Sequence, residues 1–486
     1  MAAAVLALAP GAAAGSDGSL SFVSSQSRSE LNHPTYTAVS PDGANVYVDT
    51  CTHVVSFARN AGIGALTYVD SDPIPACGLH VTVSPDGRNV YVANEAGVAV
   101  FARNATGALT LVENEDGGGL GSAQGVAVSP DGANVYVSDL SGGVYTYARD
   151  PGTGALSLVE FDIPGENFCD PSDPDYNDPH VCVDPDLAGA TDLDISADGE
   201  NVYVPASTND ALGVFSRDAG SGALTLVEIE RDGVGGADGL ESATAVAVSP
   251  DGADVYVTAD AFGSEPGVAT FSRDPSTGAV SFQEKNGGHD FDLVEDVTIS
   301  PDGQNVYVPS YGTVPRPDQL VSYARNTTTG ALTFVEADAN HDPGIDGLSA
   351  PWGADVAPDG RHVYVTVYPD DAIATFSRVA GPFQLAASAK KKQKVSALAA
   401  RVQCSWGCVL LAHAKVTVGD HKFKSKKAKE IIPADQATTL RLEFSGRALR
   451  TIRKLLAKDQ GTAAVRIEAA AEEFQQTKQL RVRVTR

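Results

Sequence analysis

Four aspartates stand close together in the stretch CDPSDPDYNDPHVC, where their carboxylates could hold a cation. They are Asp170, Asp173, Asp175 and Asp178. Ca²⁺ takes about six to eight oxygen ligands, and a short loop with clustered carboxylates supplies several of them. The spacing is not that of an EF-hand loop, so a solvated acidic loop without metal is the alternative. The stretch is therefore a candidate Ca²⁺ site.

Six cysteines occur as three couples whose members are close in the sequence. The couples are Cys51 with Cys77, Cys169 with Cys182, and Cys404 with Cys408. None has the Cys-x-x-Cys spacing of redox and zinc sites, and disulfides are typical of exported proteins. We expect a disulfide within each couple, although the spacing alone leaves other connectivities open.

A repeated tetrapeptide determines where any further site must lie. Ser-Pro-Asp-Gly, or a variant with one residue changed, begins at Ser40, Ser84, Ser129, Ser196, Ser249, Ser300 and Ala357. The spacings between successive copies are 44, 45, 67, 53, 51 and 57 residues. These values are close to the period of a four-stranded propeller blade. The sequence therefore predicts an all-β protein with a seven-bladed β-propeller.

One repeat, residues 124–160, shows why each unit should be a four-stranded meander. Four alternating or β-branched runs, GVAVS, NVYVS, GVYTYAR and ALSLVE, are separated by turn signals. Pro-Asp-Gly makes the first hairpin, because Pro presets φ and Gly supplies a positive φ. The fourth-strand motif follows a third strand only six times, and GSLSFV at Gly18–Val23 precedes the first repeat. We expect this N-terminal strand to complete the last blade.

One position within the repeat varies where its neighbours stay apolar. Four residues before the serine stand Tyr36, His80, Gly125, Asp192, Ala245, Asp296 and Gly353. Loops that enter the innermost strands open around the central channel of a propeller, where ligands bind. The candidate binding residues are Tyr36, His80, Asp192 and Asp296, with Glu295 and Trp352 beside them. A solvated acidic rim is the alternative.

Seven arginines are predicted to be parts of the scaffold. Each ends a third strand after Phe or Tyr and one further residue, and they are Arg59, Arg103, Arg149, Arg217, Arg273, Arg325 and Arg378. Buried polar groups in a repeated position normally pair with backbone or carboxylate partners. We therefore expect them to pair within the propeller rather than with a ligand.

The repeat resembles the YVTN and lactonase-type seven-bladed propellers, whose hallmark stands here as SPDGRNVYVAN at Ser84–Asn94. The resemblance covers roughly residues 16–385. It implies formation or hydrolysis of a lactone at the channel mouth, as in 6-phosphogluconolactonase, by a general base and a cation. The candidate catalytic residues are His33, His80, Arg28, Arg231, Lys285 and Arg316. The family's His-rich strand motif is not found, so a binding protein is the leading hypothesis and a lactonase-type hydrolase the alternative.

Charge divides the chain into two parts. From Ser388 onward there are 22 Lys and Arg against 8 Asp and Glu. The first 387 residues hold the remaining 13 Lys and Arg and 54 Asp and Glu. Such asymmetry predicts two bodies with different surfaces. Alternating runs after residue 388, interrupted by one helix with Ser445 as N-cap, predict a small β-sandwich. It resembles the Ig-like modules of secreted actinobacterial proteins.

The expected domains are a signal-like segment at 1–15, the propeller at 16–387 and the basic sandwich at 388–486. Residues 1–15 are apolar and Ala-rich with small residues at the end, and they resemble the later part of a secretory signal without its basic start; a disordered terminus is the alternative. We expect a secreted or cell-surface protein without a transmembrane span. The expected partner is an unknown protein, a glycan or a cell-wall polymer, since no nucleic-acid-binding motif is found.

Overall fold

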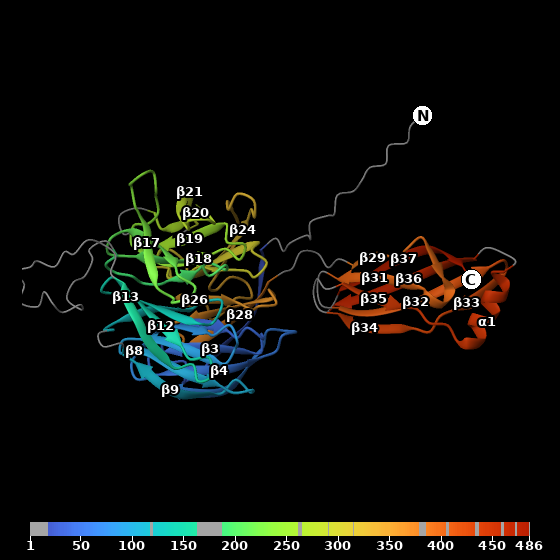
Figure 1. Ribbon diagram of the computed structural model, residues 1–486, viewed down its shortest axis with the longest axis horizontal. Coiled ribbons are helices and arrows are strands. Elements are labelled where there is room, and N and C mark those ends of the chain that lie inside the picture. Colours follow the sequence, from blue (N-terminus) through green and yellow to red (C-terminus); the bar gives the residue numbers. More distant parts are fainter. Residues whose placement is uncertain are drawn as a thin grey trace, which may run out of the picture. The chain divides into compact units, whose positions relative to one another are not determined.

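The chain forms two compact units, one that includes residues 17–379 and one that includes residues 380–486. The structure is a computed structural model. It describes residues 18–116, 120–162, 187–260, 265–289, 291–313, 315–378, 385–404, 408–432, 437–457, 461–471 and 474–485. In Figure 1 the strands of the first unit run from blue to orange, and those of the second are orange to red.

The first unit contains seven four-stranded antiparallel sheets. The first three blades are β2 (Pro34–Val39), β3 (Asn45–Thr50), β4 (His53–Arg59) and β5 (Leu66–Pro73); β6 (Gly78–Val83), β7 (Asn89–Asn94), β8 (Gly97–Arg103) and β9 (Leu109–Glu115); and β10 (Ala123–Val128), β11 (Asn134–Asp139), β12 (Gly143–Arg149) and β13 (Leu156–Asp162).

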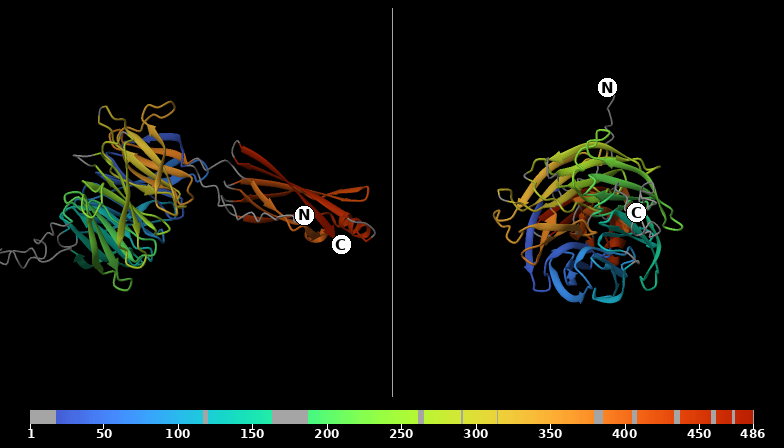
Figure 2. Two further views of the ribbon diagram at one scale, coloured as in Figure 1. Left: turned by 90° about the horizontal axis from the view of Figure 1, so that it is seen from above. Right: turned by 90° about the vertical axis from the view of Figure 1, so that its left-hand side faces the viewer.

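The next three blades follow the same order. They are β14 (Asp194–Ile195), β15 (Asn201–Ala206), β16 (Ala211–Arg217) and β17 (Leu224–Arg231); β18 (Ala243–Val248), β19 (Asp254–Ala259), β20 (Gly267–Arg273) and β21 (Val280–Gly287); and β22 (Thr298–Ile299), β23 (Asn305–Ser310), β24 (Gln319–Arg325) and β25 (Leu332–Ala339). The right-hand view of Figure 2 shows the blades following one another around a ring.

The N-terminal strand closes the ring, as the sequence predicts. The last blade consists of β26 (Pro351–Val356), β27 (His362–Val367), β28 (Ala372–Arg378) and β1 (Leu20–Ser27). Strand β1 pairs antiparallel with β28, with Leu20 opposite Arg378. Strand β1 is the outer strand of this blade, so the two ends of the propeller share one sheet and β28 is not left with an unpaired edge.

Each Ser-Pro-Asp-Gly segment forms the predicted turn between the first two strands of its blade. In the first copy the Gly43 amide donates to the Ser40 carbonyl at 2.7 Å, and Gly43 has a φ of 66°. The hydroxyl of Ser40 donates to the Asp42 carboxylate at 2.7 Å. The turn thus orients the aspartate toward the neighbouring blade.

The seven scaffold arginines join adjacent blades, which confirms the sequence-based expectation. Arg217 is representative: its Nη2 lies 2.9 Å from Asp131 in the preceding blade, and its Nε donates to the Tyr136 hydroxyl at 2.7 Å. Tyr136 in turn donates to the Gly222 carbonyl of the blade that holds Arg217. The other pairs are Arg59 with Asp359, Arg103 with Asp42, Arg149 with Asp86, Arg273 with Asp198, Arg325 with Asp251 and Arg378 with Asp302.

A disulfide between Cys51 and Cys77 also joins two blades, and it confirms one of the predicted couples. Cys51 follows β3 of the first blade and Cys77 precedes β6 of the second. Cys169 and Cys182 lie outside the described residues, and the side chains of Cys404 and Cys408 are not described. Their pairing stays a prediction.

The second unit is a β-sandwich with one α-helix in its described part. A three-stranded sheet consists of β29 (Leu385–Ser388), β31 (Ala399–Cys404) and β35 (Ala437–Arg441). The larger sheet consists of β30 (Lys392–Lys394), β37 (Phe474–Thr485), β36 (Gly461–Ala471), β32 (Cys408–Val418), β33 (His421–Lys424) and β34 (Ala428–Ile432). The short 3-10 helix η1 (Val395–Ala397) lies between β30 and β31.

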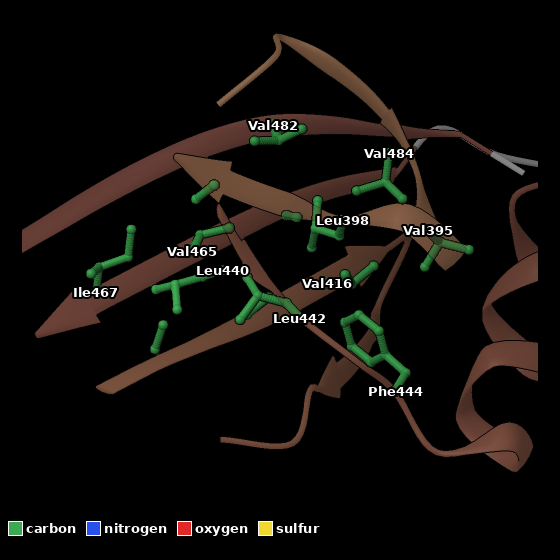
Figure 3. Close-up of a cluster of buried hydrophobic side chains, with 14 of the residues drawn as sticks. Val395, Leu398, Val416, Leu440, Leu442, Phe444, Val465, Ile467, Val482 and Val484 are labelled. Carbon is green, nitrogen blue, oxygen red and sulfur yellow. The ribbon is translucent and has the colours of Figure 1, made fainter. Parts of the chain in front are cut away.

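Apolar side chains of both sheets share one core, which Figure 3 shows. Val402 and Leu440 come from the smaller sheet, and Val465 and Val482 come from the larger one. Helix α1 (Gly446–Leu455) covers this core with the buried Ile452, and the Ser445 side chain caps it by accepting from the Ala448 amide. Because β29 pairs with β31, the second unit includes residues before 388.

We predict that Arg217→Met lowers the free energy of unfolding of the propeller by about 3 kcal/mol, because a buried charge pair loses one partner and buried oxygens lose their donor. Only 1% of the Arg217 side chain is exposed. Chemical denaturation measures the change. Arg88→Met is the control, since Arg88 directly follows the Ser-Pro-Asp-Gly turn that begins at Ser84 and its side chain is exposed. Equal effects of the two substitutions would contradict the prediction.

Candidate functional site

The first strands of neighbouring blades pack against one another around the whole ring, so they line the central channel. Each first strand pairs antiparallel with the second, as Pro34 does with Thr50. The start of the first strand and the end of the second therefore lie at the same end of the channel. We call this end the mouth; the Ser-Pro-Asp-Gly turns lie at the opposite end.

Three of the predicted binding residues form a continuous group at the mouth. The rings of Tyr36 and His80 are 4.6 Å apart between centroids. His80 Nε2 lies 3.7 Å from Asp192 Oδ1, and these two side chains come from the second and fourth blades. Blades that are distant in sequence thus contribute to one site.

The contact between His80 and Asp192 leaves polar atoms unsatisfied. His80 Nδ1 and Asp192 Oδ1 are buried without a hydrogen-bond partner. Burial lowers the pKa of His80 to about 4, and burial raises the pKa of Asp192 well above its ordinary value. The imidazole is therefore neutral at pH 7, and the two groups do not form an ion pair. Buried polar atoms without partners are uncommon in proteins, and each one calls for an explanation such as a bound water, an ion, strain or a functional role.

Two more predicted residues, Glu295 and Asp296, lie beside this group on the sixth blade. The Tyr36 hydroxyl donates to the Glu295 carbonyl at 2.9 Å. Burial raises the pKa of Asp296 to about 7, while its carboxylate accepts from the Val297 and Ala354 amides at 2.7 and 2.6 Å. Burial, with the nearby charges of Asp260 and Asp296, raises the pKa of Glu295. The mouth thus concentrates carboxyl groups that resist ionisation.

The sixth predicted residue, Trp352, belongs to an aromatic group at the same end. The Trp352 and Tyr368 ring centroids are 5.4 Å apart, and His33 stacks on Tyr368 at 4.9 Å. Tyr368 was not among the predicted residues. Its position between β27 and β28, on the mouth side, is the signal that could have identified it.

Two channel aspartates were also missed. Asp194 Oδ2 accepts from the Val248 amide and Asp355 Oδ2 from the Val39 amide, each at 2.7 Å and each from the next blade. Burial raises their pKa values to about 6 and about 7. Both stand two residues before the repeat serine or its substitute, a position that also varies between repeats. The alignment that found Asp192 and Asp296 could have found them.

The glycines in the variable position have a packing role. A Cβ at Gly353 would lie 2.6 Å from the Thr35 carbonyl oxygen, and one at Gly125 would lie 2.8 Å from Asp192 Cα. A side chain at either position would therefore clash with the backbone of an adjacent blade. These two members of the variable set bring inner strands together, and they contribute no functional group.

The cations proposed for catalysis have separate described partners. The Arg28 guanidinium lies 4.0 Å from the centre of the Tyr68 ring and contacts Glu30. Arg316 Nη1 lies 3.7 Å from Asp292, and Lys285 Nζ lies 3.5 Å from Asp238. Arg231 ends β17, the outer strand of the fourth blade. They belong to different blades and have different described neighbours, whereas His80 belongs to the group at the mouth.

The aspartates proposed to bind Ca²⁺, at 170, 173, 175 and 178, lie outside the described residues. Among the residues that are described, no group of three or more His, Cys, Asp or Glu side chains has the arrangement of a metal site. The Ca²⁺ site therefore stays a prediction from sequence. Within the same limits, no helix combines the length and apolarity needed to cross a membrane.

Known families and structures support the class of fold. The family model described as "Lactonase, 7-bladed beta-propeller" matches residues 78–170. No curated protein sequence matches the chain. The matched residues include His80 and the second and third blades.

Solved structures extend the likeness over the propeller. The periplasmic gluconolactonase PpgL of Pseudomonas aeruginosa is 22% identical, with a TM-score of 0.52 over 69% of this chain and 89% of that one. Hydrazine synthase of Kuenenia stuttgartiensis is 16% identical, with a TM-score of 0.52 over 72% and 97%. The Cps50 (Swd1) β-propeller domain of Myceliophteria thermophila is 12% identical, with a TM-score of 0.52 over 74% and 99%.

The resemblance to lactonase-type seven-bladed propellers is confirmed for the fold. At these identities the shared architecture carries no assignment of activity, because propellers with unrelated functions have the same fold. The resemblance of the second unit to Ig-like modules stays a prediction.

We predict that Glu295→Gln stabilises the propeller increasingly as pH rises from 5 to 8. A carboxyl whose pKa is raised by folding contributes stability at low pH, which is lost as pH rises through the folded-state pKa. The amide does not titrate, so the difference in free energy of unfolding should grow by about 1–2 kcal/mol over this range. Denaturation at a series of pH values measures it. The exposed Glu200→Gln is the control, and parallel curves for wild type and Glu295→Gln would refute the prediction.

Proposed function

We propose that this protein is an exported propeller that binds an amine-bearing carbohydrate at the channel mouth, with the basic sandwich as its attachment module. The observation that carries the proposal is the group of the half-buried Tyr36 and His80 with the buried Asp192, in which the atoms Asp192 Oδ1 and His80 Nδ1 lack partners. A ligand amine or hydroxyl would satisfy both atoms.

Charge favours a cationic ligand. The first 387 residues hold 13 Lys and Arg against 54 Asp and Glu, and such a field concentrates cations and repels anions. Burial raises the pKa values of the Asp192, Glu295 and Asp296 carboxyl groups, which disfavours their ionised forms. A bound ammonium group would favour their ionised forms and so gain a charge-assisted hydrogen bond.

Aromatic rings favour a sugar as the carrier of the amine. His33, Tyr368 and Trp352 form one aromatic group, and Tyr36 lies against His80. Such rings pack against the apolar faces of sugar rings and attract cations. Export is supported by the Ala-rich segment at 1–15, by the disulfide between Cys51 and Cys77, and by the periplasmic location in the name of the Pseudomonas aeruginosa structure.

Calorimetric titration with glucosamine oligomers tests the proposal. We predict binding that Asp192→Asn weakens about tenfold or more, because a charge-assisted hydrogen bond is lost. Glu200→Gln removes one exposed acid at the other end of the channel and should leave the affinity unchanged. Fully N-acetylated oligomers, which lack the amine, should bind more weakly. Equal binding of the two oligomers, or none of either, would overturn the proposed ligand class.

A lactonase-type hydrolase is the second candidate, because His80 lies within the residues matched by the lactonase family model and faces a carboxyl group. A neutral imidazole can act as a general base. The described cations are dispersed, however, and the acidic propeller repels phosphorylated substrates.

We therefore expect no turnover of gluconolactone or 6-phosphogluconolactone by the full chain above the spontaneous rate. A pH-stat assay, which records the acid released, measures it. Turnover that disappears in His80→Ala, while the folded propeller persists by circular dichroism, would establish the enzyme instead. Turnover that persists in His80→Ala would point to a contaminant.

A further inference from the structure

The larger sheet of the second unit has one buried face and one exposed face. Val416, Val465 and Val482 point into the shared core from β32, β36 and β37. Side chains alternate along a strand, so the residues next to these valines point to the opposite face. That face is solvent-exposed: Lys415, Arg466 and Arg481 are all exposed.

Cations gather on the exposed face from five strands. They are Lys392, Lys394, Lys415, Lys422, Lys424, Arg466, Arg481 and Arg483, and all of them are exposed. We call this set the basic face. No Asp or Glu occurs among the outward residues of these strands whose side chains are described.

Strand register places these cations in rows across the sheet. Lys424 is opposite Lys415, which is opposite Ala464, which in turn is opposite Arg481. In the next row Arg483 of β37 is opposite Lys392 of the neighbouring strand β30. Strands lie about 5 Å apart and alternate residues about 7 Å apart along a strand, so the charges form a regular two-dimensional array.

An array of this kind fits an extended anion better than a small one. An exposed lysine holds a single anion weakly, whereas an anionic chain contacts many cations at once and releases their counterions. The outward residues with described side chains include no Phe, Tyr or Trp. Single-stranded nucleic acids are normally bound by stacking on such rings, so the face lacks the feature that would favour a base.

We propose that the basic face binds an anionic polysaccharide, one that carries carboxylate, sulfate or phosphate groups along its length. This inference rests on the attachment role proposed for the second unit and gives that role a surface and a partner chemistry.

The test uses the full chain with two triple variants that remove equal charge from the second unit. Lys415→Gln/Lys424→Gln/Arg481→Gln removes three cations of the basic face. Arg447→Gln/Arg450→Gln/Arg453→Gln removes three exposed cations of α1. The probes are heparin, alginate and single-stranded DNA, with affinities measured by biolayer interferometry over a range of salt concentrations.

We expect the basic-face variant to bind heparin and alginate about tenfold more weakly and with a smaller salt dependence, while the α1 variant stays close to wild type. Equal losses in both variants would show attraction to net charge alone and overturn the proposal. Tighter binding of DNA than of either polysaccharide would assign the face to nucleic acid.

Self-association of the chain and ligand binding at the mouth are tested in separate experiments. If the wild type self-associates at low salt in sedimentation and the basic-face variant does not, the partner is a second copy of this acidic chain, and the proposal fails. Glucosamine-oligomer binding should be unchanged in the basic-face variant, and heparin binding unchanged in Asp192→Asn. Failure of the basic face can therefore be distinguished from failure of the mouth.

Discussion

The arginine at the end of each third strand is the interaction on which the propeller depends. Its guanidinium binds the turn aspartate of the preceding blade, as Arg217 does with Asp131, and its Nε binds a strand tyrosine in most blades. Two blades meet at every such arginine, including the pair that closes the ring through Arg59 and Asp359. A buried guanidinium is stabilising only when its donors are satisfied, so the turn, the tyrosine and the arginine must occur together. This requirement explains why the repeat is so uniform at the end opposite the mouth.

At the mouth, by contrast, the residues differ from blade to blade. Most of its carboxyl groups are bound by the backbone: Asp296 accepts from two amides, and Asp194 and Asp355 join inner strands of adjacent blades. These aspartates hold backbone segments of the inner strands in place despite their variable positions. Asp192 differs because one oxygen is bound by the Val246 amide and the other faces His80 without a partner. The proposed ligand is expected to interact with this oxygen.

The two units have opposite charge and different surfaces for binding. The propeller concentrates buried acids and aromatic rings at one end of a channel, where shape and desolvation favour a small ligand. The sandwich distributes exposed cations over a sheet face, where many weak contacts favour a long one. The two proposed binding surfaces have no residue in common, so substitutions can test each of them separately.

Much of the fold follows from sequence, because local patterns determine it. The Ser-Pro-Asp-Gly turns, the alternating strands and the Ser445 cap each depend on residues that are close together in the chain. The role of Gly18–Val23 followed instead from the missing fourth strand of the last repeat. The sequence also indicated Tyr36, His80, Asp192 and Asp296, since variation in a repeated position reveals departure from the scaffold. Which of them meet was decided by ring closure, which brings the second, fourth and sixth blades together across the channel. Tertiary packing alone made Gly125 and Gly353 obligatory, bound Asp296 to backbone amides, and left Asp192 Oδ1 unpaired.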